Sequence, residues 1–196
     1  DGPNTTHFSI VDRDGNRVAA TLTVNTLFGS GFVAGTTGVL LNNEMDDFAV
    51  AAGVPNAYGL VGSRANAIEP GKRPLSSMAP TFVEDRRGVL VLGTPGGSRI
   101  ISMVLLAVLR HLAQDPVDVA AIVSAPRYHH QHLPDRIEVE PEGFDEAWRA
   151  ALAAKGHTVS VAARRWGNMQ AVFVEAGGGV AAAASDPRGQ GGIAWY

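Results

Sequence analysis

The sequence has 196 residues, 45% of them hydrophobic, with 23 glycines, no cysteine and a formal net charge of −3. These values indicate one globular domain with a sizeable core. The absence of cysteine excludes disulfides, thiol nucleophiles and thiolate metal ligands, and the lack of any basic run argues against nucleic acid as a partner. The most apolar run, residues 100–109, is too short to span a bilayer, so we expect a buried helix there and no membrane span in this chain.

Two β-hairpins are predicted in the first half of the chain. Residues 8–11 and 17–25 flank the sequence DRDGN, and an Asp-Gly pair between two strand-like runs is typical of a tight hairpin turn. Residues 80–83 and 88–93 flank the charged sequence EDRR in the same way. Both hairpins imply antiparallel pairing.

The segment between these hairpins shows little periodicity. A short apolar strand is expected around residues 39–41. Residues 49–73 are rich in Gly, Pro, Ala and Asn. A loop of that length in a compact domain is more often a functional lid than a simple connection.

The second half of the chain predicts helices followed by strands. The expected helices are residues 98–114, 117–124 and 145–155, and the expected strands are 158–162, 169–175 and 180–184. In the first helix, the apolar residues at 101, 104, 105, 108 and 112 are predicted to share one face. Strands, then helices, then strands again are typical of an α+β fold with mostly antiparallel pairing.

The sequence NTTHFS places two threonines at the start of the first predicted strand. Threonine is common in strands, so Thr5 and Thr6 have an ordinary structural explanation. A threonine can also be a catalytic nucleophile when its own α-amine acts as the base, and this requires a free N-terminus at Thr5. From these residues alone, both interpretations stay open.

Three further segments contain residues that suit a binding site. GTPGGSRI (93–100) is either a plain tight turn or a turn whose backbone N–H groups hold an oxyanion or a phosphate, and it lacks the Gly-Lys-Ser/Thr ending of a P-loop. LLNNEMDDF (40–48) is either a solvated acidic turn or a carboxylate pair for an ammonium group or a hard metal. RPLSSMAP (73–80) holds two hydroxyls between prolines, which suits carboxylate recognition.

The sequence RYHHQH (127–132) contains three histidines. His130 and His132 could share one face of a strand, but no carboxylate or thiolate at typical zinc spacing accompanies them. We therefore expect ordinary packed or exposed histidines and no metal, and no pattern in the sequence indicates a cofactor.

In this order, seven short motifs resemble the small, C-terminal subunit of γ-glutamyltransferases (γ-glutamyl transpeptidases): NTTHFS, NEMDDF, GVPNAYGL, GKRPLSSMAPT, GTPGGSRI, APRYHHQ and ASDPR. The resemblance covers residues 5–196 and implies the N-terminal nucleophile hydrolase fold, a four-layer αββα sandwich. It also implies a precursor that cuts itself between Asn4 and Thr5. Residues 1–4 would then be the end of the large-subunit segment, and residues 5–196 the catalytic small-subunit domain, with the two subunits remaining associated.

By the same resemblance, the enzyme cleaves the γ-glutamyl amide bond of glutathione and related compounds without a cofactor. Thr5 would be the nucleophile, Thr23 would orient it, and the N–H groups of Gly96 and Gly97 would hold the oxyanion. The γ-glutamyl-threonine intermediate would then pass its acyl group to water or to an amino-acid or peptide acceptor.

The resemblance also assigns the residues that bind the substrate. Asn25, Glu44 and Asp47 would hold the substrate α-ammonium, although Glu44 stands where some relatives have glutamine. Ser76 and Ser77 would hold the α-carboxylate together with an arginine supplied by the large subunit.

Tyr58 matches the tyrosine of the lid in lidded members, and the family implies a bacterial protein that is periplasmic or secreted. Three alternatives stay open: an acylase of the same fold that cleaves glutaryl or other side-chain amides, an unprocessed ligand-binding relative without activity, and a metal-dependent hydrolase built on the histidines. The acidic and serine residues favour an α-amino-acid head group, so γ-glutamyl compounds are the expected substrates.

Overall fold

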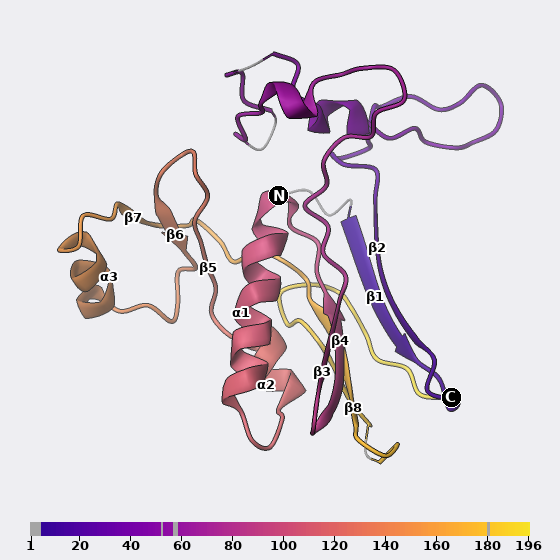
Figure 1. Cartoon of the computed structure of the whole chain (residues 1–196), viewed down its shortest axis with the longest axis vertical. Coiled ribbons are helices and arrows are strands. Elements are labelled where there is room, and N and C mark those ends of the chain that lie inside the picture. The colour runs from indigo at the N-terminus through magenta and orange to yellow at the C-terminus, as the bar shows by residue number, and fades with distance from the viewer. Residues whose placement is uncertain (1–4, 52, 57–58, 180) are drawn as a thin grey trace.

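The computed structural model describes residues 5–51, 53–56, 59–179 and 181–196, and these form three β-sheets around a central helix (Figure 1). The first sheet is the hairpin of β1 (Thr5–Val11) and β2 (Arg17–Thr23). The second has the strand order β3 (Thr81–Asp85), β4 (Gly88–Gly93), β8 (Gln170–Glu175) and β9 (Ala181–Ser185). The third contains β5 (Tyr128–His129), β6 (Ile137–Val139) and β7 (Val159–Val161). Among these strands, β6 and β7 pair in parallel and the other pairs are antiparallel.

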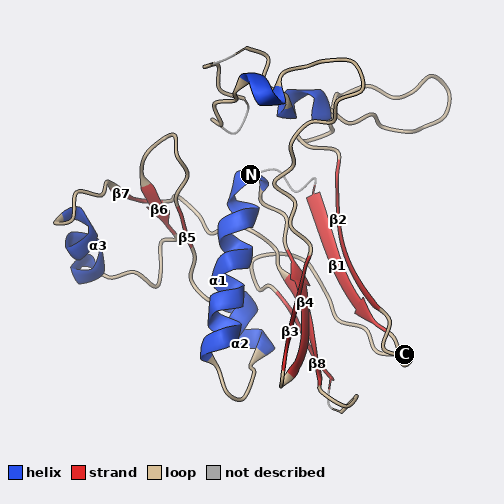
Figure 2. Ribbon diagram, in the orientation of Figure 1, coloured by secondary structure: helices blue, strands red, loops and turns tan. Residues whose placement is uncertain are grey.

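The α-helices are α1 (Ile100–Ala113), α2 (Val119–Ser124) and α3 (Glu146–Ala153), and three short 3-10 turns are η1 (Glu44–Asp47), η2 (Arg64–Asn66) and η3 (Gly97–Arg99). Helices α1 and α2 lie on one side of the four-stranded sheet, and the β1–β2 hairpin lies on the other (Figure 2). The predicted α+β class with mostly antiparallel pairing is confirmed.

Both predicted hairpins are present, and the first is fixed by its turn. Asp12 Oδ1 accepts hydrogen bonds from the backbone N–H groups of Asp14 and Asn16 at 2.9 and 2.8 Å. Gly15 has a φ of +83°, which glycine adopts without strain. The resulting register pairs Thr5 with Thr23 at the open end of the hairpin.

The main core lies between the four-stranded sheet and helices α1 and α2. Strand β4 is buried along its whole length, and its Leu90 and Leu92 are fully buried. They pack in one cluster with Ile100 and Met103 of α1 and Phe173 of β8. This packing fixes the start of α1, and therefore the turn that precedes it, against the sheet.

The predicted apolar face of the first helix is mostly wrong. Of its five positions only Val104 is buried, and the buried residues of α1 are Ile100, Met103, Val104, Ala107 and His111. Ile101, Leu105, Leu109 and Leu112 are 51–60% exposed. Because α1 is apolar nearly all round, its periodicity does not identify the face that meets the sheet. Among the described residues, no helix combines the length and apolar character needed to cross a bilayer.

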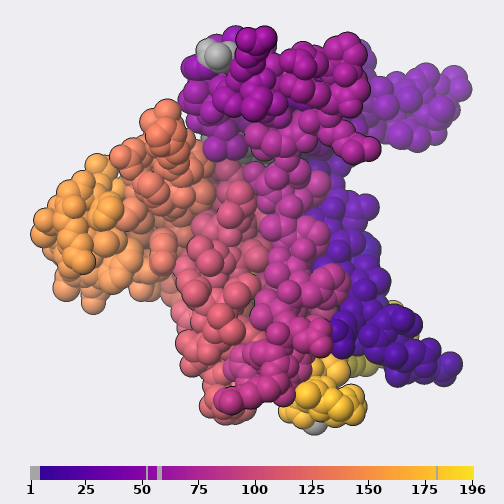
Figure 3. Space-filling model, viewed as in Figure 1, coloured from indigo at the N-terminus to yellow at the C-terminus, as the bar shows by residue number. Residues whose placement is uncertain are grey.

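The strand expected around residues 39–41 is also wrong. Val33 and Leu40 form an isolated bridge within an arm, residues 26–41, that projects from the body of the molecule (Figure 3). None of the three sheets includes a residue of this arm, and Phe28 and Phe32 within it are 66% and 71% exposed. Strands β5 and β6 were not predicted, because two or three residues are too few to show an alternating pattern.

Four charged residues with buried side chains connect the end of α2, the third sheet and the C-terminal strands: Arg127, Glu140, Asp186 and Arg188. Arg127 Nη2 lies 2.5 Å from Asp186 Oδ2, and Arg188 Nη2 lies 2.6 Å from Glu140 Oε2. Glu140 also accepts hydrogen bonds from the backbone N–H groups of Arg127 and Trp166. Both carboxylates are 2% exposed, so they depend on these protein donors in place of water.

Replacing Glu140 by glutamine should destabilise the protein, because the Arg188 guanidinium then stays buried beside a neutral amide. We expect the free energy of unfolding of the full-length protein to fall by about 3–5 kcal/mol, measured by urea denaturation. Glu142→Gln is the matched control: its pair with Arg165 is exposed, so the change should stay below about 1 kcal/mol. Equal effects of the two substitutions would contradict the role of the buried charges.

Candidate active site

The register of the first hairpin brings Thr5 and Thr23 together. Thr5 Oγ donates a hydrogen bond to Thr23 Oγ at 2.9 Å, and the backbone N–H of Asn25 donates to Thr23 Oγ at 2.8 Å. Thr23 Oγ therefore accepts twice, and the Thr5 hydroxyl hydrogen points to it. The lone pairs of Thr5 Oγ are left for attack on an electrophile.

The acidic residues lie on the 3-10 turn η1, beside the hairpin end. Glu44 and Asp47 are three residues apart, a spacing that stacks side chains on one face of a 3-10 turn. Burial and the neighbouring Asp47 raise the pKa of Glu44 to about 7, and burial also raises the pKa of Asp47. Among the described residues, no group hydrogen-bonds to the buried Glu44 Oε1. The pair therefore suits a cationic hydrogen-bond donor.

Asn25 is held between the threonines and the acidic turn. It is buried with a φ of +72°, a left-handed conformation that asparagine tolerates better than most residues. Its Nδ2 donates to the carbonyl oxygen of Asn43 at 3.2 Å, directly before η1. The contact ties the end of β2 to the acidic turn.

The glycine turn connects β4 to η3 and α1. Gly96 and Gly97 have φ values of +148° and +58°, both in the region that favours glycine. A Cβ on Gly96 would lie 2.4 Å from Met103 Cε, the end of a flexible side chain that would have to shift, so the positive φ is the stronger reason for glycine there. The turn leads directly into a helix, whose first N–H groups have no partner within the helix and can bind a negative charge.

One pocket gathers these groups. It is lined by the polar residues Thr5, Thr23, Asn25, Glu44, Asp47, Ser76, Ser77, Gly97 and Ser98, and by the apolar residues Leu60, Leu75, Met78 and Ile100. Of the other predicted site residues, Gly96 does not line the pocket, although its neighbour Gly97 does. Tyr58 lies outside the described residues. Ser98 was not predicted, although it directly follows the two glycines in GTPGGSRI.

None of the three histidines of residues 127–132 lines this pocket, although Gln131 of the same segment accepts a hydrogen bond from Ser98. His129 is buried beside α1, whereas His130 is exposed and its Nε2 lies 2.8 Å from Asp135 Oδ1. Within the part of the chain that the structure describes, no three His, Asp or Glu side chains come together in a way that could hold a metal ion.

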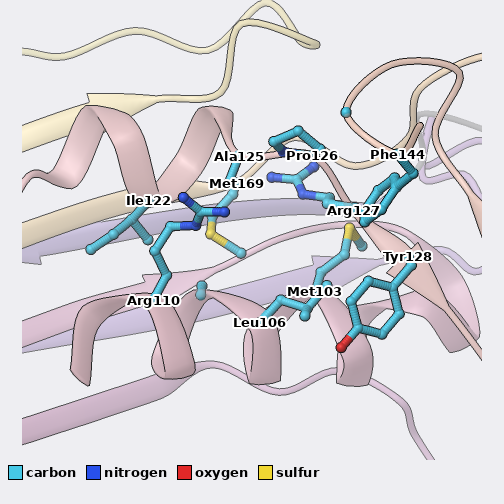
Figure 4. Close-up of a pocket in the computed structure, with 12 residues that line it drawn as sticks. Met103, Leu106, Arg110, Ile122, Ala125, Pro126, Arg127, Tyr128, Phe144 and Met169 are labelled. Carbon is cyan, nitrogen blue, oxygen red and sulfur yellow. The ribbon is translucent and has the colours of Figure 1, made fainter. Parts of the chain in front are cut away.

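A second pocket lies between α1, α2 and the residues that follow α2 (Figure 4). Its lining is largely apolar, with Met103, Leu106 and Ile122 beside the guanidinium of Arg110. It shares no residue with the pocket of Thr5, and none of the predicted site residues lies in it.

The amino-acid sequence was compared with those of known protein families and proteins. The sequence model of the gamma-glutamyltranspeptidase family matches residues 1–196. The glutathione hydrolase proenzyme of Escherichia coli K12 is 52% identical over 185 residues, which are 94% of this chain and 31% of the relative. The corresponding proenzyme of Pseudomonas aeruginosa is 48% identical over 190 residues, 95% of this chain and 34% of the relative. The chain thus spans about a third of the length of these curated relatives.

Solved structures of gamma-glutamyltranspeptidases have the same fold as this chain. An acivicin-inhibited gamma-glutamyltranspeptidase superposes with a TM-score of 0.87 at 44% identity, over 93% of this chain and 98% of that one. The gamma-glutamyltranspeptidase of Pseudomonas nitroreducens complexed with L-DON gives a TM-score of 0.85 at 47% identity, over 97% of this chain and all of that one.

The raised pKa of Glu44 predicts how stability depends on pH in the ligand-free protein. The folded protein keeps a proton up to about pH 7 that the unfolded chain, with a Glu pKa of 4.5, has already lost. Stability from this group is therefore present at low pH and lost as the pH rises to about 7. Glu44→Gln removes the loss, so the variant should gain stability relative to the parent between pH 4.5 and 8.

Urea midpoints at the two pH values measure this gain. The exposed Glu69, which pairs with Lys72, provides the matched control Glu69→Gln, whose effect on the midpoint should be the same at both pH values. A Glu44→Gln variant less stable than the parent at pH 8 would show that the carboxylate is satisfied within the protein.

Proposed function

Because the chain belongs to the gamma-glutamyltranspeptidase family, we propose that it is the catalytic portion of a glutathione hydrolase that also transfers γ-glutamyl groups. The observation that carries the proposal is the Thr5–Thr23 hydroxyl pair, which lines one pocket together with two carboxylates and the glycine turn. A nucleophile, a cation site and an anion site within one pocket are what cleavage of a γ-glutamyl amide needs.

In the acylation step, Thr5 Oγ attacks the γ-carbonyl carbon of the substrate. The hydroxyl, which donates to Thr23 Oγ in the free protein, turns to the free α-amine of Thr5 and passes its proton to it. The ordinary pKa of this amine, about 8, suits a base near neutral pH. As the C–N bond breaks, the same proton passes to the leaving amine, and a γ-glutamyl ester of Thr5 remains. Water, or the amine of an amino acid or peptide, then attacks the ester and restores the hydroxyl.

The other residues have roles that follow from the charges of the substrate. The N–H groups of Gly96 and Gly97 bind the oxyanion of the tetrahedral intermediate. Glu44, Asp47 and Asn25 bind the α-ammonium.

The α-carboxylate of the substrate is bound by Ser76 and Ser77 and by an arginine of the large subunit. Tyr58 closes the pocket as part of a lid. No step requires a cofactor or a metal.

We also propose that a large subunit from the same precursor completes the four-layer αββα sandwich, with residues 5–196 as the catalytic domain and residues 1–4 as a remnant of the other segment. Two observations support a partner. The relatives are about three times longer than this chain. The outer face of α1 exposes Ile101, Leu105, Leu109 and Leu112, a row of apolar side chains typical of a protein interface. The relatives compared above are bacterial, and from the family resemblance we propose that the enzyme is periplasmic or secreted.

The precursor is proposed to cleave itself between Asn4 and Thr5. Thr5 Oγ attacks the Asn4 carbonyl carbon, the peptide C–N bond breaks, and the resulting ester is opened by water. The curated relatives are named proenzymes, which supports such a maturation. Before the cut the α-amine is part of a peptide bond, so a group other than this amine must accept the hydroxyl proton.

Substitutions at the first residues of β1 test this mechanism. Thr5→Ala should give one uncut, folded chain without γ-glutamyl hydrolase activity, as measured by intact mass and by release of glutamate. Thr5→Ser should process and turn over more slowly, because the hydroxyl stays while the methyl that restricts its rotamer is lost. Thr6→Ala is the matched control, since Thr6 is exposed and outside the pocket of Thr5. A cleaved, active Thr5→Ala protein would exclude Thr5 as the nucleophile.

A glutaryl acylase is the second candidate, and the acidic pair argues against it. A glutaryl group lacks the α-ammonium and would leave Glu44 and Asp47 without a cation. We expect kcat/KM for a γ-glutamyl anilide to exceed that for the glutaryl anilide at least about 100-fold, and Asp47→Asn to reduce this ratio about tenfold or more. Equal rates on the two anilides would favour the acylase.

A further inference from the structure

A line of side-chain hydrogen bonds connects the glycine turn with the segment that follows β5. Ser98 Oγ donates to Gln131 Oε1 at 2.9 Å, and His129 Nε2 lies 2.9 Å from the same oxygen. His129 Nδ1 lies 2.7 Å from Ser102 Oγ in the first turn of α1. The roles described above for the pocket do not include Gln131, His129 or Ser102.

The hydrogen positions along this line follow from the orientation of one amide. Gln131 Nε2 donates to the carbonyl oxygen of Leu133 at 2.7 Å, so Oε1 is the atom that faces Ser98 and His129. Because Oε1 only accepts, both the Ser98 hydroxyl and His129 Nε2 must donate to it.

The imidazole fits this arrangement in its neutral form. Burial lowers the pKa of His129 and favours the form with one proton, which is then on Nε2. His129 Nδ1 is left to accept from the Ser102 hydroxyl, which has the carbonyl oxygen of Arg99 at 3.0 Å as its alternative acceptor. Ser98, Gln131 and His129 therefore each have one consistent hydrogen-bonding role.

The glycine turn needs such an anchor. Gly96 and Gly97 have no side chains and accept a wide range of backbone angles, so they do not fix their own N–H directions. Before them, Thr94 is held by the backbone N–H of Asn168, which donates to Thr94 Oγ at 3.1 Å. After them, Ser98 is the first residue with a side chain, and its hydroxyl is held by Gln131.

We propose that Gln131, oriented by His129 and by the Leu133 carbonyl, is a positioning residue that holds the Gly96-Gly97 turn in place through Ser98. The inference rests on the proposed function, in which the N–H groups of this turn bind the oxyanion. The oxyanion exists in the transition state and not in the bound substrate, so a loosened turn lowers kcat and leaves KM nearly unchanged.

Kinetics of the full-length, processed protein test this role. In Gln131→Ala and in Ser98→Ala, kcat for γ-glutamyl hydrolysis should fall about tenfold with KM within about twofold of the parent. The kcat of the double variant should be no lower than that of the less active single variant, because both substitutions break the same contact. Ser98→Thr keeps the hydroxyl and should recover most of the loss. His130→Ala is the matched control, since this exposed neighbour pairs with Asp135 and should leave kcat unchanged.

Hydrogen–deuterium exchange of residues 93–100 gives a readout that does not depend on activity. Exchange should become at least about fivefold faster in Gln131→Ala and stay unchanged in His130→Ala. If the Gln131→Ala precursor does not cleave itself, both the kinetics and the hydrogen–deuterium exchange are measured on Ser98→Ala, which removes only one hydroxyl.

The outcomes separate this inference from the proposed function. If the parent protein has no γ-glutamyl activity, the proposed function is rejected. If exchange of residues 93–100 is still faster in the variants of that parent, the role of Gln131 in holding the glycine turn is supported. Additive losses in the double variant, or a lower melting temperature with unchanged kcat and unchanged exchange, would overturn the positioning role.

Discussion

The buried carboxylates of Glu140 and Asp186 are the constraint on which the rest of the structure depends. Each is enclosed by protein and needs donors from several elements at once. These donors include the guanidinium of Arg127 before β5, that of Arg188 after β9, and the backbone N–H of Trp166 before β8. An unpaired charge at this depth is strongly destabilising, so the third sheet, the end of α2 and the C-terminal strands must come together as one unit.

The first hairpin lines one part of the pocket of Thr5, and the glycine turn with the start of α1 lines another. Arg127 directly precedes β5, and Gln131, the partner of Ser98, follows two residues after this strand. The glycine turn is thereby connected to the buried charges. The position of Thr5, in contrast, follows from the Asp-Gly turn of the hairpin, whose register places it opposite Thr23. Thr5 and the glycine turn, the proposed nucleophile and anion site, come from different parts of the chain and meet only when both parts are folded.

The sequence predicts the local elements better than it predicts their packing. The Asp-Gly turn indicated the hairpin, and Asp145 at the start of α3 accepts a hydrogen bond from the N–H of Trp148 as a helix cap. The buried face of α1 and the parallel pairing of β6 with β7 could not be read from sequence, because both depend on distant neighbours. The site residues were proposed from their resemblance to a family, because no single motif identifies them, and most of them line one pocket. Ser98 was missed because its role depends on a contact with Gln131, 33 residues away.

The acidic pair shows how binding and stability oppose each other in this pocket. Glu44 and Asp47 lie on one short turn, and burial disfavours the charge of each. Within the described residues, Glu44 Oε1 has no donor. A bound ammonium would supply that donor and turn the repulsion of two carboxylates into attraction to a shared cation. The same arrangement therefore disfavours the empty pocket at neutral pH and favours the occupied one. A neutral or anionic head group would gain nothing from it, so the placement of charge supports the proposed α-amino-acid head group.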